Sequence, residues 1–181
     1  MADYYSQTVI QQNIPISDMT VLERLVLEAM FQSDVENHAL YFYHDEGPHE
    51  VIYLDRKELV AANDPKIDTG TLGTLILDAI NEAAPDSADI EVDLTAISWE
   101  VILQPIIARS STLTYLTIVT SWTCSKMRPD GFGGMATLVT ADIIESQSTY
   151  EIVEQWIGEM EDTTKPAPQG MSAALDQGAS P

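Results

Sequence analysis

The fold is decided by the stretch Leu113-Thr-Tyr-Leu-Thr-Ile-Val-Thr-Ser-Trp122, followed after a glycine-rich connection by Met135-Ala-Thr-Leu-Val-Thr-Ala141. Both runs are dense in β-branched and aromatic residues, which favour strands. Apolar side chains occupy both alternations of the first run, as in strands that are covered on two faces. We therefore predict that two long neighbouring strands form the centre of a sheet.

Helices are predicted where apolar residues recur three and four positions apart. Thr20 and Glu23 have the spacing of a capping box, before a helix that runs to about Gln32. Further helical patterns cover residues 71–83, 99–109 and 149–162, the last one after a second capping-box spacing at Ser148 and Glu151. Pro105 should kink the predicted helix over residues 99–109.

The remaining strands are predicted from short aromatic and β-branched runs. Ala39–His44 and Val51–Leu54 flank the turn sequence Asp45-Glu46-Gly47-Pro48, which indicates a hairpin. Ile90–Leu94 alternates with period two, as in a half-exposed strand. That strand, the 99–109 helix and the first central strand would form a βαβ unit with a right-handed crossover.

These elements predict an α+β fold. We expect a mixed β-sheet of about five strands with helices packed on its faces, one βαβ unit and two hairpins. Residues 1–17 are interpreted as an N-terminal arm or a short edge strand, residues 18–162 as a single domain, and residues 163–181 as a flexible tail because of their Ser, Ala, Gly and Pro content.

The charge of the chain limits its partners. The chain has 29 acidic and 8 basic residues, a formal net charge of -21. Such a charge opposes direct binding to nucleic acid or to an anionic membrane surface and favours a basic protein partner. No apolar run approaches the length of a membrane span, and the first residues lack the regions of a signal peptide. We therefore expect a cytoplasmic location.

The connection from Cys124 to Gly134 is the most distinctive local motif. Successive glycines allow backbone N–H groups to converge on an anion that neighbouring cations would help to hold. The candidate anion-binding residues are Lys126, Arg128, Gly131, Gly133 and Gly134. The spacing is not that of a phosphate-binding P-loop. The alternative is a glycine-rich connection whose two cations pair with carboxylates of the chain itself.

Other catalytic and metal-binding patterns are weak. Cys124 would need a neighbouring base to act as a nucleophile, and a lone cysteine at a strand end is more typical of a core. His44 and His49, with carboxylates at positions 45, 46 and 50, would offer ligands to a metal, but their spacing matches no zinc motif. Solvated turn residues are the preferred interpretation. We expect no cofactor and no metal, and an enzyme is the minority hypothesis.

Two surfaces are candidates for contact with other proteins. Leu27 and Phe31 add a second apolar stripe to the first helix, which would form the face of a homodimer or be buried within the fold. The last helix carries an apolar arc, and its opposite side carries the anionic row of Glu151, Glu154, Glu161 and Asp162. Such a row would imitate nucleic acid toward a basic nucleic-acid-binding enzyme.

The segments Ser98-Trp-Glu100 and Cys124-Ser-Lys-Met-Arg-Pro-Asp-Gly-Phe-Gly-Gly-Met135 resemble a group of small acidic proteins of bacterial accessory DNA, such as plasmids. The resemblance covers about residues 97–142. That group has no established function, so no site residue carries over, and the resemblance implies only a mobile-element role. The sequence thus favours a non-enzymatic acidic protein-binding domain, in one form a nucleic-acid-mimicking inhibitor, with an anion-binding domain or enzyme at the Cys124–Gly134 loop as the alternative.

Overall fold

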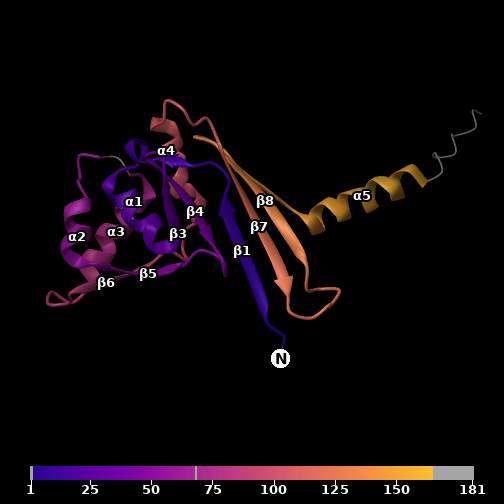
Figure 1. The fold of residues 1–181 in the computed structure, drawn as a ribbon, viewed down its shortest axis with the longest axis horizontal. Coiled ribbons are helices and arrows are strands. Elements are labelled where there is room, and N and C mark those ends of the chain that lie inside the picture. The colour runs from indigo at the N-terminus through magenta and orange to yellow at the C-terminus, as the bar shows by residue number, and fades with distance from the viewer. Residues whose placement is uncertain (1, 68, 165–181) are drawn as a thin grey trace, which may run out of the picture. The chain divides into compact units, whose positions relative to one another are not determined.

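A computed structural model describes residues 2–67 and 69–164 of the chain, and over these residues the fold is α+β (Figure 1). The α-helices are α1 (Val21–Met30), α2 (Arg56–Ala62), α3 (Thr71–Glu82), α4 (Leu103–Arg109) and α5 (Thr149–Thr164), with 3-10 turns η1 (Ile16–Asp18) and η2 (Trp99–Ile102). The strands are β1 (Tyr4–Ile10), β2 (Ile14–Pro15), β3 (Gln32–Glu36), β4 (Ala39–His44), β5 (Val51–Asp55), β6 (Asp89–Asp93), β7 (Leu116–Cys124), β8 (Gly133–Val139) and β9 (Ile144–Ser148). The chain divides after Thr149 into two compact units, so most of α5 forms a unit by itself.

The first unit is built on a large sheet in which seven of the described strands pair. The order along the sheet is β2-β4-β1-β7-β8-β9, and β3 pairs with β4. Strand β7 is central, with β1 along one side and β8 along the other, so that Thr120 is opposite both Thr8 and Met135. The prediction that two long strands form the centre of a sheet is confirmed.

The prediction of a mixed sheet of about five strands is wrong, because every strand pair among the described residues is antiparallel. The βαβ unit is absent for a related reason. Strand β6 pairs with β5 in a separate two-stranded sheet, whereas β7 belongs to the large sheet. Helix α4 therefore connects two sheets and is not a crossover within one sheet. Alternation along a strand shows which face is buried but does not show which strand is its neighbour.

The prediction of a hairpin between β4 and β5 is also wrong, because β4 forms its hairpin with β3. The tight turn between β3 and β4 is formed by Asn37 and His38, both with positive φ, at 50° and 65°. Two consecutive residues of positive φ match the right-handed twist of a hairpin. Without a glycine, this turn gives a weak sequence signal. The second predicted hairpin, β7 with β8, is confirmed.

The N-terminal segment is an integral part of the sheet and is not an arm. Strand β1 lies between β4 and β7 and pairs with β7 along its whole length, from Tyr4 opposite Cys124 to Ile10 opposite Ile118. The polar and amide-rich character of this segment concealed it, because only alternate residues of β1 face the core. Ile10 is fully buried and Thr8 is nearly so.

Helices α1, α3, α4 and α5 occur where the sequence predicts them. Thr20 and Glu23 form a complete capping box at the start of α1, with each side chain bonded to the backbone N–H of the other residue. The 99–109 segment is divided into η2 and α4. Pro105 occupies the first turn of α4, where its missing N–H removes no helical hydrogen bond, so no kink is required.

One hydrophobic core lies between the large sheet, the small sheet and helices α1 to α4. Its fully buried members include Phe42, Val26, Ile76 and Ile106. Leu27 and Phe31 belong to the same core, with exposed fractions of 0% and 5%. These two side chains are therefore buried by their own chain, and the face that we considered for a homodimer does not reach the surface.

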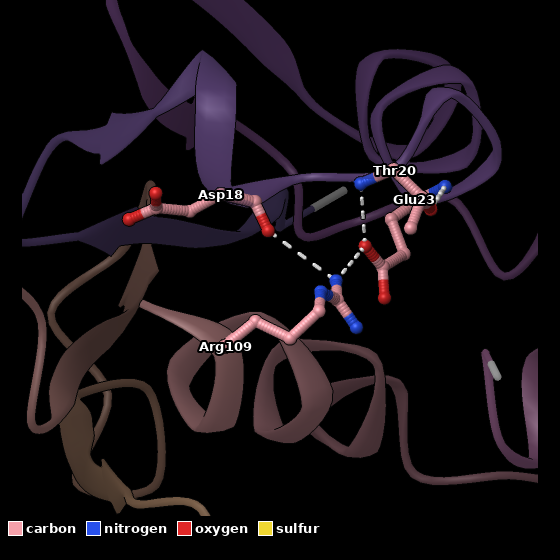
Figure 2. A network of polar contacts seen from close by, with 4 residues as sticks. All are labelled: Asp18, Thr20, Glu23 and Arg109. Carbon is pink, nitrogen blue, oxygen red and sulfur yellow. Dashed lines mark hydrogen bonds and ion pairs between the residues drawn. The ribbon is translucent and has the colours of Figure 1, made fainter. Parts of the chain in front are cut away.

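One buried ionic contact joins α1 to α4 (Figure 2). Glu23 is fully buried, and its Oε2 accepts hydrogen bonds from the backbone N–H of Thr20, at 2.8 Å, and from the guanidinium of Arg109. Arg109 Nη2 also donates to the carbonyl of Asp18, at 3.3 Å. A buried carboxylate needs a counter-charge, so this contact fixes how α4 lies against α1.

Removal of that counter-charge should destabilise the fold strongly. We expect Arg109→Met to lower the free energy of unfolding by about 3 kcal/mol, because it leaves the Glu23 carboxylate buried and uncompensated. The matched control is Arg24→Met, whose i,i+4 pair with Glu28 is partly exposed and should contribute only about 0.5 kcal/mol. Urea unfolding of the two variants checks this prediction, and equal losses would contradict it.

Candidate functional site

The inner face of the large sheet continues past the helices (Figure 1). Near the helices this face carries core residues such as Ile10 and Ile118. Side chains of one strand face alternate sides of the sheet. The same face therefore continues along β1, β7 and β8, where hydroxyl side chains are mixed with large apolar ones. These are Ser6 and Thr8 on β1, Thr120 and Trp122 on β7, and Met135 and Thr137 on β8.

These residues form the floor of a hollow of about 360 Å³, which we call the sheet-end hollow. Its rim comes from the segment between β4 and β5, which contributes Glu46 and Glu50, and from η2, which contributes Trp99 and Glu100. The hollow therefore combines two indole rings with three carboxylates. None of its described lining residues is a lysine or an arginine.

Hydroxyl groups on the floor of the hollow are held in place by hydrogen bonds. Thr8 Oγ1 lies 3.1 Å from Thr120 Oγ1, and Thr137 Oγ1 lies 2.8 Å from Ser146 Oγ. Because the buried hydroxyls of Thr8 and Thr137 already have hydrogen-bond partners, the floor has no strong demand for a polar ligand. The charged groups of the hollow are therefore confined to its rim.

The rim is held by contacts with the core and with the small sheet. The ring of Trp99 packs edge to face against Phe31, with centroids 5.0 Å apart. The backbone N–H of Leu94 donates to the carbonyl of Glu50, at 2.7 Å, and the N–H of His49 donates to the carbonyl of Met30, at 3.0 Å. Three separate parts of the fold thus position the backbone of the rim at His49 and Glu50 and one indole ring.

His44 and His49 lie together beside the hollow, with their Nε2 atoms 3.2 Å apart. The backbone N–H of Glu46 donates to Nδ1 of His44, at 3.0 Å. The proton of neutral His44 is therefore on Nε2, so the Nε2 lone pair that a metal would need is absent. No group of three or more His, Cys, Asp or Glu side chains in the described ranges is arranged to hold a metal ion.

The pKa of His44 is lowered from the ordinary value of 6.5, first by burial and then by the neighbouring His49. The carboxylates of Asp45 and Glu46 act in the opposite direction. His44 is only 8% exposed. Burial disfavours the charged imidazolium, so the neutral form is the one that fits this site.

In the Cys124–Gly134 loop, two of the glycine N–H groups of the anion-site hypothesis already have hydrogen-bond partners within the chain. The N–H of Gly131 donates to the carbonyl of Arg128, at 3.1 Å, and the N–H of Gly134 donates to Thr149 Oγ1, at 3.2 Å. Arg128 pairs with Asp130 of the same loop, Nε to Oδ1 at 3.2 Å. Gly133 begins strand β8, and Lys126 is exposed. Arg128 therefore pairs with a carboxylate of the chain itself, and the anion site stays a prediction.

Gly131 is required by close packing against Cys124. A Cβ atom at position 131 would lie 2.7 Å from the Cβ of Cys124 and 3.3 Å from the carbonyl oxygen of Arg128. Cys124 is a free, buried thiol. Its packing matches the core residue that the sequence analysis preferred over a nucleophile.

We expect Gly131→Ala to lower the free energy of unfolding by about 1–3 kcal/mol, the cost of overpacking a filled site. The control is Gly158→Ala in α5, where an added Cβ meets no atom within 4 Å. Alanine should raise the helix content there, because it favours a helix by about 1 kcal/mol over glycine. Thermal unfolding and far-ultraviolet circular dichroism measure the two effects. An unchanged melting temperature for Gly131→Ala would contradict the packing argument.

Helix α5 forms its own unit and is described by itself. The four carboxylate residues of its predicted anionic row, Glu151, Glu154, Glu161 and Asp162, are all exposed. Its apolar residues Val153, Trp156, Ile157 and Met160 are exposed too, and Trp156 has an exposed fraction of 62%. The predicted tail begins at residue 163, and residues 165–181 lie outside the described residues.

Sequence reasoning missed the sheet-end hollow, although it located most of the elements that build it. Trp99 and Trp122 were visible as aromatic residues of a helix and a strand. Nothing in the sequence shows that Glu46 and Glu50 lie beside them, because these positions are joined only through the packing of the two sheets.

Comparison with family models, curated proteins and solved structures finds no match to the chain. The resemblance to small acidic proteins of bacterial accessory DNA therefore stays a prediction. Within the described part of the chain, no helix is both long and apolar enough to cross a membrane.

Proposed function

We propose that the protein is a non-enzymatic binding domain for a basic protein, and that the sheet-end hollow receives a lysine or arginine side chain of that partner. One observation carries the proposal: Trp99, Trp122 and the carboxylates of Glu46, Glu50 and Glu100 line one hollow. This composition suits a cation on an apolar stem. Neither an anion nor an uncharged apolar group would use both kinds of side chain.

The energetics support a cationic side chain. A cation over an indole ring gains about 0.5–1 kcal/mol at an exposed site and about 2 kcal/mol when water is excluded. Hydrogen bonds from a charged donor to a carboxylate are about twice as strong as those between neutral groups. The volume of about 360 Å³ is at the lower end of the range of ligand pockets, which suits one long side chain.

The net charge of the chain supports the same partner. With a formal charge of -21, the protein attracts a basic partner over long range and accelerates encounter at low salt. Long-range attraction gives little specificity by itself. The hollow adds a defined contact in which indole rings and carboxylates act on the same cation.

We expect the variant Glu46→Gln/Glu50→Gln/Glu100→Gln to bind a hexa-arginine peptide about tenfold more weakly than the parent, a loss of about 1.4 kcal/mol. Quenching of tryptophan fluorescence and titration calorimetry measure the affinity. The matched control is Glu58→Gln/Glu82→Gln/Asp86→Asn, which removes the same charge from exposed positions outside the hollow. An equal loss of affinity in both variants would show that the peptide responds to the net negative charge of the protein and not to the hollow.

Helix α5 supports a second candidate function, imitation of nucleic acid toward a basic nucleic-acid-binding enzyme. The observation that favours it is the exposure of Glu151, Glu154, Glu161 and Asp162 on one helix. Residues rise by about 1.5 Å each along a helix, so these carboxylates form a linear row that is sparser than the one charge per about 1.7 Å of duplex DNA.

We expect Glu151→Gln/Glu154→Gln/Glu161→Gln/Asp162→Asn to lose a basic nucleic-acid-binding enzyme that the parent retains in affinity capture at low salt. Exposed charges are screened within about 10 Å at 0.1 M salt, so added salt should weaken the parent complex steeply. Circular dichroism must show that α5 persists in the variant. Retention of the enzyme by parent and variant alike would exclude this helix as the mimic.

A further inference from the structure

The pair of histidines beside the hollow has a defined proton arrangement. Nδ1 of His44 accepts the backbone N–H of Glu46, so the ring proton is on Nε2. That Nε2–H points to Nε2 of His49, 3.2 Å away, which must accept it. The ring proton of His49 is therefore on Nδ1. The two rings meet edge to face, with centroids 4.6 Å apart.

An additional proton cannot be added to this arrangement without loss of a hydrogen bond. His49 is exposed and His44 is buried, so solvent delivers the proton to Nε2 of His49. Two N–H groups would then face each other across 3.2 Å. The contact is restored only if His44 moves its proton from Nε2 to Nδ1, and this change ends the bond from the Glu46 N–H.

We propose that the His44–His49 pair is a proton-sensitive switch for the sheet-end hollow: the neutral pair holds Glu46 at the rim, and protonation of His49 releases it. Glu46, Gly47 and Pro48 line the hollow and lie between the two histidines in the chain. Gly47 has a φ of 90°, which adapts this short segment to its bent path. The effect of the switch on ligand binding rests on the proposed function. Its effect on the position of the Glu46–Pro48 segment does not.

The charged groups that act on His44 contribute to the direction of the response. They are the carboxylates of Asp45 and Glu46, which favour protonation, while burial of His44 opposes it. The neutral contacts are Thr8, opposite His44 on β1, and the Met30 carbonyl, which accepts the N–H of His49.

The sign of the pH dependence follows from the Glu46 hydrogen bond that an additional proton removes, and the lowered pKa of His44 acts in the same direction. The folded state binds this proton less readily than the unfolded chain. The stability that the neutral pair contributes is therefore complete above about pH 6.5 and is lost as the pH falls below that value.

The switch is tested by NMR of the full chain at about pH 7.5 and about pH 5.5, which lie on either side of the histidine range. We expect the ¹⁵N shifts of His44 to report Nε2–H at the higher pH and Nδ1–H at the lower pH. Protection of the Glu46 amide from hydrogen exchange, corrected for the intrinsic pH dependence, should fall by up to about tenfold per pH unit below 6.5. An unchanged His44 tautomer, or unchanged Glu46 protection, would overturn the proposal.

Two variants make the test specific. Gln at position 49 offers an oxygen near the place of Nε2 and does not titrate, so His49→Gln should keep the Glu46 amide protected at about pH 5.5. The control is His38→Asn, which replaces the third histidine in the β3–β4 turn, where Asn tolerates the positive φ of 65°. The control should respond to pH like the parent. Loss of Glu46 protection in His49→Gln would overturn the switch.

The binding measurement separates the switch from the proposed function. The affinity for hexa-arginine should fall between about pH 7.5 and about pH 5.5 in the parent and stay constant in His49→Gln. If hexa-arginine binds neither the parent nor His49→Gln at the higher pH, the proposed function is contradicted. Hydrogen exchange of the Glu46 amide would still test whether the histidine pair acts as a switch. Equal pH dependence in both proteins would exclude the histidine pair as its cause.

Discussion

The structure of the first unit depends on a mismatch of length between strands and helices. Strand β7 has nine residues and spans roughly 30 Å at about 3.3 Å per residue. Helix α1 has ten residues and spans roughly 15 Å at about 1.5 Å per residue. A helix of this kind covers only part of a strand, so the inner face of the sheet is a core at one end and a hollow at the other. The hydroxyl groups along β1, β7 and β8 suit the end of the sheet that forms the hollow.

The distribution of charge follows from the scarcity of cations. All four arginines of the chain make internal contacts: Arg24 and Arg128 pair with carboxylates, Arg109 compensates buried Glu23, and Arg56 bonds to the carbonyls of Ser87 and Ala84. The acidic surface is therefore left with few positive side chains to balance it. Such a surface favours a basic partner at long range, and a lined hollow is needed to turn that attraction into a specific contact.

The segment between β4 and β5 links the core, the hollow and the histidine pair. It passes from the large sheet to the small one, and its contacts with Met30 and Leu94 anchor it to α1 and to the end of β6. Glu46 lies between the two histidines and is bonded to the first of them. The segment thus carries Glu46 of the rim. The backbone N–H of Glu46 is also the group on which the proposed proton switch depends.

The sequence by itself determined the local elements, because their signals are short in range. The capping box at Thr20 and Glu23, the period-two burial of Ile90 and Val92, and the hairpin of β7 and β8 all follow from residues a few positions apart. Only the tertiary structure decided which strands pair: β1 entered the sheet interior, and β6 joined β5 in a second sheet. The burial of Phe31 and the meeting of Trp99 with Trp122 and Glu46 at the hollow depend on those pairings. An alternating pattern specifies the buried face of a strand, whereas the choice of neighbour is set by long-range packing that no local pattern encodes.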